Sequence, residues 1–256
     1  HKYYYFWWVM INGLKFFGLY LSMLGNVFSR PENSKIYLKR IIDEMIKIGV
    51  NSLTIVSIIS LFMGAVVTIQ TGLQLDNPFI PKYLIGYATR ESLILEFSPT
   101  MIALILAGKV GSSIASEIGT MRVSEQIDAL EIMGINSAAF IIQPKIIASI
   151  LFFPFLVIIS MGIGMFGGFL AATLGGIISK PEFLQGLTYW FEPFYIFYAI
   201  VKTVFFAFAI SSISSFFGYF TSGGALAVGK SSTKSVVYSC IVILIMNFIL
   251  TQLMLA

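Results

Sequence analysis

Residues 146–179 read IIASILFFPFLVIISMGIGMFGGFLAATLGGIIS, a run of 34 residues without a charged side chain. The hydrocarbon core of a bilayer, about 30 Å thick, is crossed by roughly 20 apolar residues in a helix. The run is therefore long enough for a membrane span with extra turns. Its small residues predict the close approach of a second membrane helix. They are Gly162, Gly164, Gly167, Gly168 and Ala171.

The composition of the whole chain agrees with a membrane protein. Of 256 residues, 57% are hydrophobic and 11% are charged, whereas soluble domains are roughly half apolar and a quarter charged. The net charge of +4 is too small and too dispersed for nucleic-acid binding. The single cysteine, Cys240, and the single histidine, His1, exclude a disulfide scaffold, a four-cysteine zinc site and a histidine-based metal site or triad.

Further uncharged runs predict the other spans. They are residues 51–75, 203–229 and 235–256. A last run, 84–107, is a span only if Glu96, and at its outer end Arg90 and Glu91, are accepted in the membrane. No segments of strict alternation recur, so a β-barrel is not indicated. We therefore predict an all-α integral membrane protein with five transmembrane helices.

The distribution of basic residues predicts the orientation, because Lys and Arg stay on the cytoplasmic side when helices insert. With the N-terminus inside, 12 of the 16 Lys and Arg fall in inner segments. Lys82, Arg90 and Lys180 fall on the outer side, and Lys202 falls at a helix start. The N-terminus is therefore predicted to be cytoplasmic and the C-terminus to be on the far side of the membrane.

Residues 1–49 are predicted to form a region of interfacial and amphipathic helices before the five-span domain, 50–256. The aromatic cluster Tyr3–Trp8 is typical of headgroup depth, and the segment is expected to lie in the interface without crossing. Residues 32–48 then predict an amphipathic helix on the inner surface or against the bundle. Its apolar stripe is Leu38, Ile41, Ile42, Met45 and Ile46.

Two motif matches fail on their context. Residues 224–231, GALAVGKS, satisfy the P-loop pattern, and residues 162–167, GIGMFG, satisfy the dinucleotide-binding pattern. Both motifs require a preceding strand in a βαβ unit, whereas these lie among uncharged membrane runs. We interpret the first as a turn of small residues and the second as part of a helix contact.

The most polar internal stretch, residues 108–134, is predicted to be cytoplasmic and to end in a short helix. Ser124 is a candidate N-cap and Gly134 a candidate C-terminal stop. Glu125, Asp128 and Glu131 fall on one side of that helix, and Ile127, Leu130 and Met133 on the other. The pattern fits either an ordinary solvated helix or a docking helix whose apolar ridge enters a groove on a partner.

Residues 115–134, ASEIGTMRVSEQIDALEIMG, resemble the signature of MlaE-type permeases, the membrane subunits of ABC transporters that move phospholipid between the two membranes of Gram-negative envelopes. The resemblance extends to Glu96-Phe-Ser-Pro99, Pro144-Lys145, Lys202 and residues 229–237, GKSSTKSVV. It covers nearly everything from Asn51 onward. It departs from the family pattern at Leu95, where the family has arginine, and at Asn247, where an acid is frequent.

The resemblance implies a homodimer in the bacterial inner membrane, with an acyl-chain cavity between the copies. It also implies a cytoplasmic ABC ATPase that binds the ATP, a periplasmic MCE-domain subunit that exchanges the lipid, and no catalysis or cofactor of its own. The implied lipid-binding residues are Val67, Gln70, Leu73, Leu75, Leu93, Glu96, Lys202 and Asn247. The implied ATPase-coupling residues are Glu117, Arg122, Glu125, Gln126, Asp128 and Glu131.

Glu96 is the sharpest single candidate, since an ionisable residue inside the membrane is costly and usually functional. It is either a polar point in a lipid cavity, paired with Lys202, or a structural ion pair or cap beside Pro99. Lys202 can alternatively snorkel to the interface. An intramembrane lipid-modifying enzyme that uses Glu96 and Lys202, and a plain membrane scaffold, are the competing hypotheses.

Overall fold

The computed structural model describes residues 2–28, 34–75 and 79–255, with side chains for 15–28, 37–75 and 79–255. All regular elements in these residues are helices, and five helices are long and apolar enough to cross a membrane. The prediction of an all-α protein with five spans is therefore confirmed. The side chains of the predicted aromatic cluster Tyr3–Trp8 lie outside the described ones.

Three of the spans are single helices, and two are composite. The first span joins α2 (Ser34–Met45), the π-helix η1 (Ile46–Val50) and α3 (Asn51–Gln74). The second joins α4 (Tyr83–Ser92), the π-helix η2 (Leu93–Met101), α5 (Ile102–Leu106), the π-helix η3 (Ala107–Gly111) and α6 (Ser112–Val123). The others are α8 (Ser137–Leu174), α10 (Pro193–Tyr219) and α11 (Ala225–Leu255).

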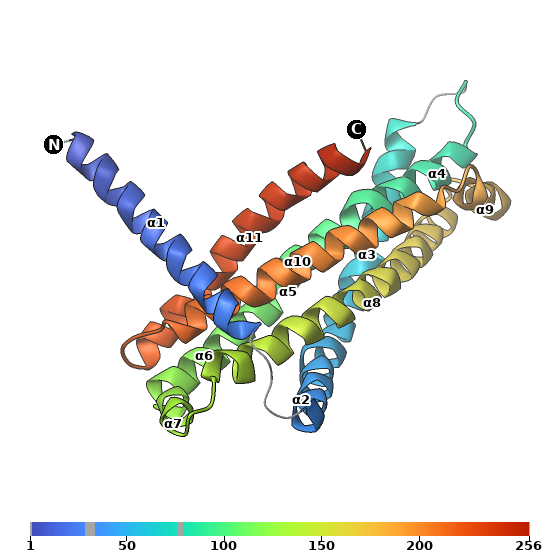
Figure 1. The fold of residues 1–256 in the computed structure, drawn as a ribbon. Helices are drawn as coiled ribbons and strands as arrows, with labels where there is room; N and C mark the ends of the chain where they lie inside the picture. The colour runs from blue at the N-terminus through green and yellow to red at the C-terminus, as the bar shows by residue number, and fades with distance from the viewer. Residues whose placement is uncertain (1, 29–33, 76–78, 256) are drawn as a thin grey trace.

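Shorter elements mark the two ends of an elongated bundle (Figure 1). Helix α7 (Gln126–Ile132) lies at one end with α6 and α2, and α9 (Lys180–Thr188) lies at the other with α4. We call these the α7 end and the α9 end. Helix α1 (Lys2–Val27) precedes the spans and contacts α8 and α10.

The third and fourth spans begin earlier than predicted, and both for one physical reason. The third begins at Ser137 rather than at residue 146, and the fourth at Pro193 rather than at residue 203. Each includes a lysine, Lys145 or Lys202, that is buried and ion-paired within the bundle. A compensated charge does not end a span, so rules that stop at every charge place these ends incorrectly. The boundary between the last two spans is also wrong, because the fourth ends at Tyr219 rather than at 229 and the fifth begins at Ala225 rather than at 235.

The predicted amphipathic helix 32–48 forms from Ser34 onward, as α2 and most of η1, and continues into α3 without a break across the predicted boundary at residue 49. Of its predicted apolar stripe, Ile41 is buried whereas Leu38, Ile42 and Ile46 are exposed. The helix turns this way because Glu44 faces the bundle and pairs with Lys145 of α8. Leu38, Ile42 and Ile46 are therefore left on the outside of the bundle.

The rejected nucleotide motifs are both helical. Residues 225–231 form the first turns of α11, and residues 162–167 lie in the middle of α8. A phosphate-binding loop is therefore absent from both of these segments.

The glycines of α8 provide its close contact with α3. A Cβ atom on Gly64 would collide with the backbone of Gly164, and one on Gly167 would collide with the backbone of Leu61. The hydroxyl of Ser60 hydrogen-bonds to that of Ser160 at 2.8 Å in the same contact. The predicted role of the small residues as a helix-helix interface is confirmed, although Gly162 faces open space.

We expect Gly167→Ala to destabilise the protein, because the added methyl group must push α3 away from α8. Overpacking of this kind costs about 1–3 kcal/mol. The matched control, Gly162→Ala, adds the same methyl group where nothing lies within 4 Å. Thermal unfolding in detergent should show a lower midpoint for Gly167→Ala and an unchanged or higher one for Gly162→Ala. Equal midpoints would contradict the interface.

Candidate functional site

The second span is irregular where its acidic residue lies. Pro99 has no N–H to donate and clashes with the preceding turn of a regular α-helix. The helix responds with nine residues of π-helix, Leu93–Met101, which contain both Glu96 and Pro99. Wider turns of this type are frequent at functional sites. They re-aim side chains, and here the segment directs Glu96 toward α10 and α11.

Glu96 and Lys202 form an ion pair inside the bundle. Lys202 Nζ lies 2.8 Å from Glu96 Oε1 and 2.7 Å from the hydroxyl of Tyr198. It also donates to the backbone carbonyl of Leu95 at 3.3 Å. The ammonium group has three protons, so this set of partners satisfies it. The pairing that the sequence left open is therefore formed, and Lys202 does not snorkel.

Polar residues of α11 complete the cluster around the carboxylate. The amide of Asn247 donates to Glu96 Oε2 at 3.2 Å, and Thr251 Oγ1 lies 3.4 Å from Glu96 Oε1. Thr100 Oγ1 lies 3.1 Å from Glu96 Oε2 and 3.0 Å from Asn247 Oδ1. A hydroxyl has one proton, so Thr100 serves one of these acceptors at a time. Three spans meet at this cluster.

The two partners of the ion pair differ in exposure, and the difference decides what the site can do. The side chain of Lys202 is 0% exposed, whereas that of Glu96 is 43% exposed. A carboxylate inside a membrane is stable only against water, a ligand or another polar group. The site therefore leaves part of the Glu96 side chain open to the space beside the bundle. Lys202 cannot reach a substrate there.

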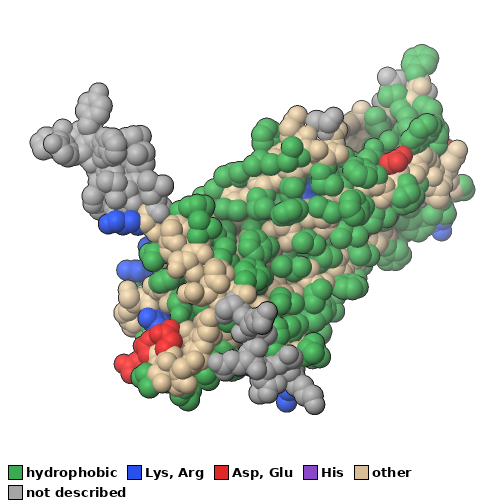
Figure 2. All heavy atoms as spheres, in the orientation of Figure 1, with side chains coloured by type: hydrophobic (Ala, Val, Ile, Leu, Met, Phe, Trp, Pro, Cys, Tyr) green, Lys and Arg blue, Asp and Glu red, His purple; other side chains and the backbone are tan. Residues whose placement is uncertain are grey.

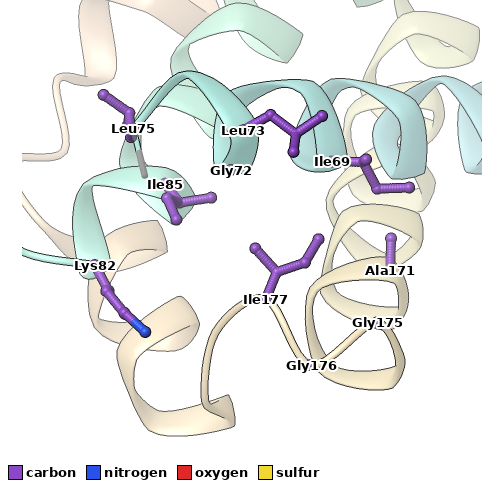
Figure 3. A pocket seen from close by; sticks show the side chains of 10 residues that line it. All are labelled: Ile69, Gly72, Leu73, Leu75, Lys82, Ile85, Ala171, Gly175, Gly176 and Ile177. Atoms are coloured by element: carbon purple, nitrogen blue, oxygen red, sulfur yellow. The ribbon is translucent and has the colours of Figure 1, made fainter. Parts of the chain in front are cut away.

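The other predicted lipid-binding residues do not gather at this cluster. Leu73 and Leu75 line a cavity of about 770 Å³ at the α9 end. Figure 3 shows Ile85 and Ile177 projecting into this cavity, with Lys82 at one side. Gln70 is exposed outside its lining. Lys82 and Ile177 are not predicted from the sequence, because no pattern relates the loops that bring them together.

Val67 and Leu93 are buried within the single chain. Leu93 lies beside Gly164 in the contact between the second and third spans. In this conformation neither residue offers a surface to an acyl chain, in contrast to the expectation from the resemblance.

Helix α7 has the predicted end and a different start. Gly134 has φ +78°, and the N–H groups of Gly134 and Ile135 bond back to the carbonyls of Glu131 and Leu130. This is the Schellman stop that favours glycine. The prediction of Ser124 as N-cap is wrong, because its hydroxyl donates to the Thr120 carbonyl at the end of α6. Glu125, with φ +60°, makes the turn into α7.

Most of the predicted coupling residues have partners within the chain. Arg122 pairs with Asp128 at 2.6 Å, and Glu117 pairs with Lys47 and Lys145 at 2.6 and 3.0 Å. Glu131 accepts hydrogen bonds from Ser137 and Tyr219. Glu125 and Gln126 are exposed. Figure 2 shows acidic side chains gathered at the α7 end, beside basic ones.

The apolar ridge of α7 is turned differently from the prediction. Ile127 is buried in the core of the chain, and Leu130 is half-buried against it. The exposed apolar residues are instead Ile132, at 88%, and Met133, at 64%. Ile127 therefore anchors α7 to the core, and Ile132 and Met133 at the C-terminal end of the helix are exposed. We call these two residues the tip of α7.

These features define a multi-pass membrane protein with a polar cluster inside the membrane and an exposed helix between two spans. The chain belongs to the MlaE permease family, since the family model described as "Permease MlaE" matches residues 41–253. That match begins within α2, before the predicted domain boundary.

Curated relatives cover most of the chain. It is 38% identical over 218 residues to a probable ABC transporter permease protein of Rickettsia bellii, covering 85% of this chain and 84% of the relative. It is 34% identical to a probable ABC transporter permease protein of Synechocystis, over 91% of this chain and 88% of the relative. It is 30% identical to the intermembrane phospholipid transport system permease protein MlaE of Haemophilus influenzae, with the same coverage.

We expect Glu96→Gln to destabilise the protein more than Lys202→Met does. Removal of Glu96 leaves a fully buried ammonium without its counter-charge, a loss of about 3–5 kcal/mol for buried pairs. Removal of Lys202 leaves a carboxylate that is partly exposed and still bonded to Asn247. The double variant should be more stable than Glu96→Gln alone. Unfolding in detergent measures all three, and additive losses would refute the coupling.

Protonation of Glu131 should loosen α7. The hydrogen bonds from Ser137 and Tyr219 lower the pKa of Glu131 below its ordinary value of 4.5. A lowered pKa in the folded state contributes stability that is present above pH 4.5 and is lost as the pH falls below it. The protection of the α7 amides against hydrogen exchange, corrected for the intrinsic pH dependence of exchange, should therefore fall in that range. Tyr219→Phe should reduce this pH dependence, whereas an unchanged profile would contradict the role of the bond.

Proposed function

We propose that the chain is the permease subunit of an ABC transporter that moves phospholipids between the inner and outer membranes of a bacterial envelope. The observation that carries the proposal is the half-open polar cluster. It combines a buried cation with a carboxylate that is 43% exposed inside an otherwise apolar bundle. Such an arrangement suits a cavity that admits a polar headgroup and is expensive for a protein that only anchors others.

A homodimer would give the exposed side of Glu96 its environment. In a single chain the carboxylate would face lipid, and its cost would be several kcal/mol at the bilayer centre. A second copy around the same space would enclose it with a polar or hydrated lining. The long apolar face of α3, which includes Ile55, Ile58 and Phe62, is exposed in the single chain and is available for this cavity.

The energy would come from a separate cytoplasmic ATPase that docks at α7. The exposed tip, Ile132 and Met133, and the exposed polar residues Glu125 and Gln126 form a small surface of mixed character. Helix α6 precedes α7 and is continuous with the second span, which contains Glu96. A displacement of α7 would therefore be transmitted along one helix to the polar cluster.

The two ends of the bundle would lie in different compartments. The α7 end would be cytoplasmic and the α9 end periplasmic, where an MCE-domain subunit would deliver or accept the lipid. The chain itself would need no cofactor and perform no catalysis. An intramembrane enzyme is less well supported, because Lys202 is fully buried and has no access to a substrate.

Reconstitution with the ATPase in liposomes tests the proposal. We expect ATP-dependent transfer of labelled phospholipid by the complex and none by the chain alone. Ile132→Glu should release the ATPase and abolish transfer, because it places a charge in the centre of the docking tip. Leu184→Glu, on the exposed face of α9 at the other end, is the matched control and should retain transfer. A wild-type complex that hydrolyses ATP and moves no lipid would overturn the function.

A further inference from the structure

A further cavity, with charged and polar residues in its lining, lies toward the α7 end, beyond α5 from Glu96 along the second span. Its volume is about 240 Å³, and it opens between η1 and the start of α3 on one side and η3 and α6 on the other. Its polar lining residues include Lys47, Asn51, Lys109 and Ser113 as well as the acids Glu44 and Glu117. An adjoining hollow shares Lys47, Ser113 and Glu117 with it, so the cavity continues along α6.

The charges around this cavity leave one cation uncompensated. Lys145 Nζ lies 2.6 Å from Glu44 and 3.0 Å from Glu117, and Lys47 Nζ lies 2.6 Å from Glu117. Both carboxylates are thus engaged. Lys109 has no carboxylate partner among the described residues and donates to the backbone carbonyl of Asn51. The lining itself has two lysines, Lys47 and Lys109, and two glutamates, Glu44 and Glu117. The buried Lys145 pairs with both glutamates from behind the lining, so the cluster as a whole has one positive charge in excess.

The available hydrogen-bond donors favour a phosphate group. The ammonium groups of Lys47 and Lys109 each have three protons, and the hydrogen bond that each makes to a described residue uses one of them. The Asn51 amide and the Ser113 hydroxyl are exposed beside them. Phosphate oxygens accept several charge-assisted bonds at once, which is what this set of donors offers.

The surface next to the cavity is apolar and suits the acyl chains of a lipid whose phosphate lies in the cavity. Asn51, Ile55, Ile58 and Phe62 follow a spacing of four, three and four residues, so they lie on one face of α3. The last three of them are exposed. The stripe continues to Ile69 and Leu73, which line the cavity at the α9 end. Acyl chains below a phosphate at Lys109 would lie on this stripe.

We propose that the cavity beside Lys109 binds the phosphate of a phospholipid in the leaflet at the α7 end, with its acyl chains along the exposed stripe of α3. The proposal deepens the proposed function and rests on it, because the bound lipid would be the one transported. It adds a binding site at the opposite end of α3 from the cavity lined by Leu73, and α3 connects the two.

Binding of phosphatidylglycerol to the full chain in detergent, measured by native mass spectrometry, tests the site. Lys109→Met should weaken binding about tenfold or more, the equivalent of one charge-assisted hydrogen bond. Ser113→Glu keeps Lys109 and places a negative charge in the cavity, so it should weaken binding similarly. It tests the site independently if Lys109→Met fails to fold. Lys39→Met removes an exposed lysine of α2 outside the cavity lining and should bind as the wild type does.

The ligands in the titration distinguish the sources of the phosphate. Diacylglycerol with the same chains should bind weakly, and inorganic phosphate should not compete at comparable concentration. Competition by inorganic phosphate would overturn the lipid assignment. Equal binding by Lys109→Met, Ser113→Glu and the wild type would overturn the site.

Transport by the wild-type complex separates this inference from the proposed function. Normal transport together with unaltered lipid binding by Lys109→Met would refute the inference alone. Binding of phosphatidylglycerol that depends on Lys109, without transport by the wild type, would refute the transport function and leave the site.

Discussion

The burial of Lys202 is the constraint on which the packing of the second, fourth and fifth spans depends. An ammonium group with no exposure must have its charge and its protons satisfied by the protein. Glu96 supplies the counter-charge, Tyr198 a hydroxyl and Leu95 a carbonyl. These groups come from two spans, and the carboxylate in turn holds Asn247 and Thr251 of a third. One buried charge therefore fixes the relative depth of three helices.

A second buried lysine has the same effect at the α7 end. Lys145 of α8 lies between Glu44 of α2 and Glu117 of α6. Glu96 pairs with the buried Lys202, and Glu117 pairs with the buried Lys145. Both acids lie on the second span, which is one continuous helix. The π-helix η3 and the end of η2 lie between them. Because π-turns accommodate shifts in helix register, this segment is suited to transmit a movement of α6 to Glu96 while both ion pairs persist.

The sequence predicts those features that depend on local pattern. Uncharged runs predict five spans, the glycines of α8 predict its contact with α3, and Gly134 predicts the end of α7. Features that depend on distant partners are not predicted. Lys145 and Lys202 look like span boundaries until their acids are known, and Ile127 looks like a docking residue until the core beneath it is seen. Glu96, Lys202 and Asn247 are predicted as site residues, whereas Tyr198, Thr100 and Thr251 and the half-open geometry of the cluster are not.

The departures from the family pattern at Leu95 and Asn247 are consistent with a working cluster. An arginine at 95 and an acid at 247 would add one charge of each sign within the membrane. This chain has Leu95 and Asn247 there, so Glu96 and Lys202 form a neutral pair within the cluster. Position 95 still contributes through its backbone carbonyl, and the Asn247 amide donates to the carboxylate that an acid would repel. The cluster therefore needs its charges balanced more than it needs any particular number of them.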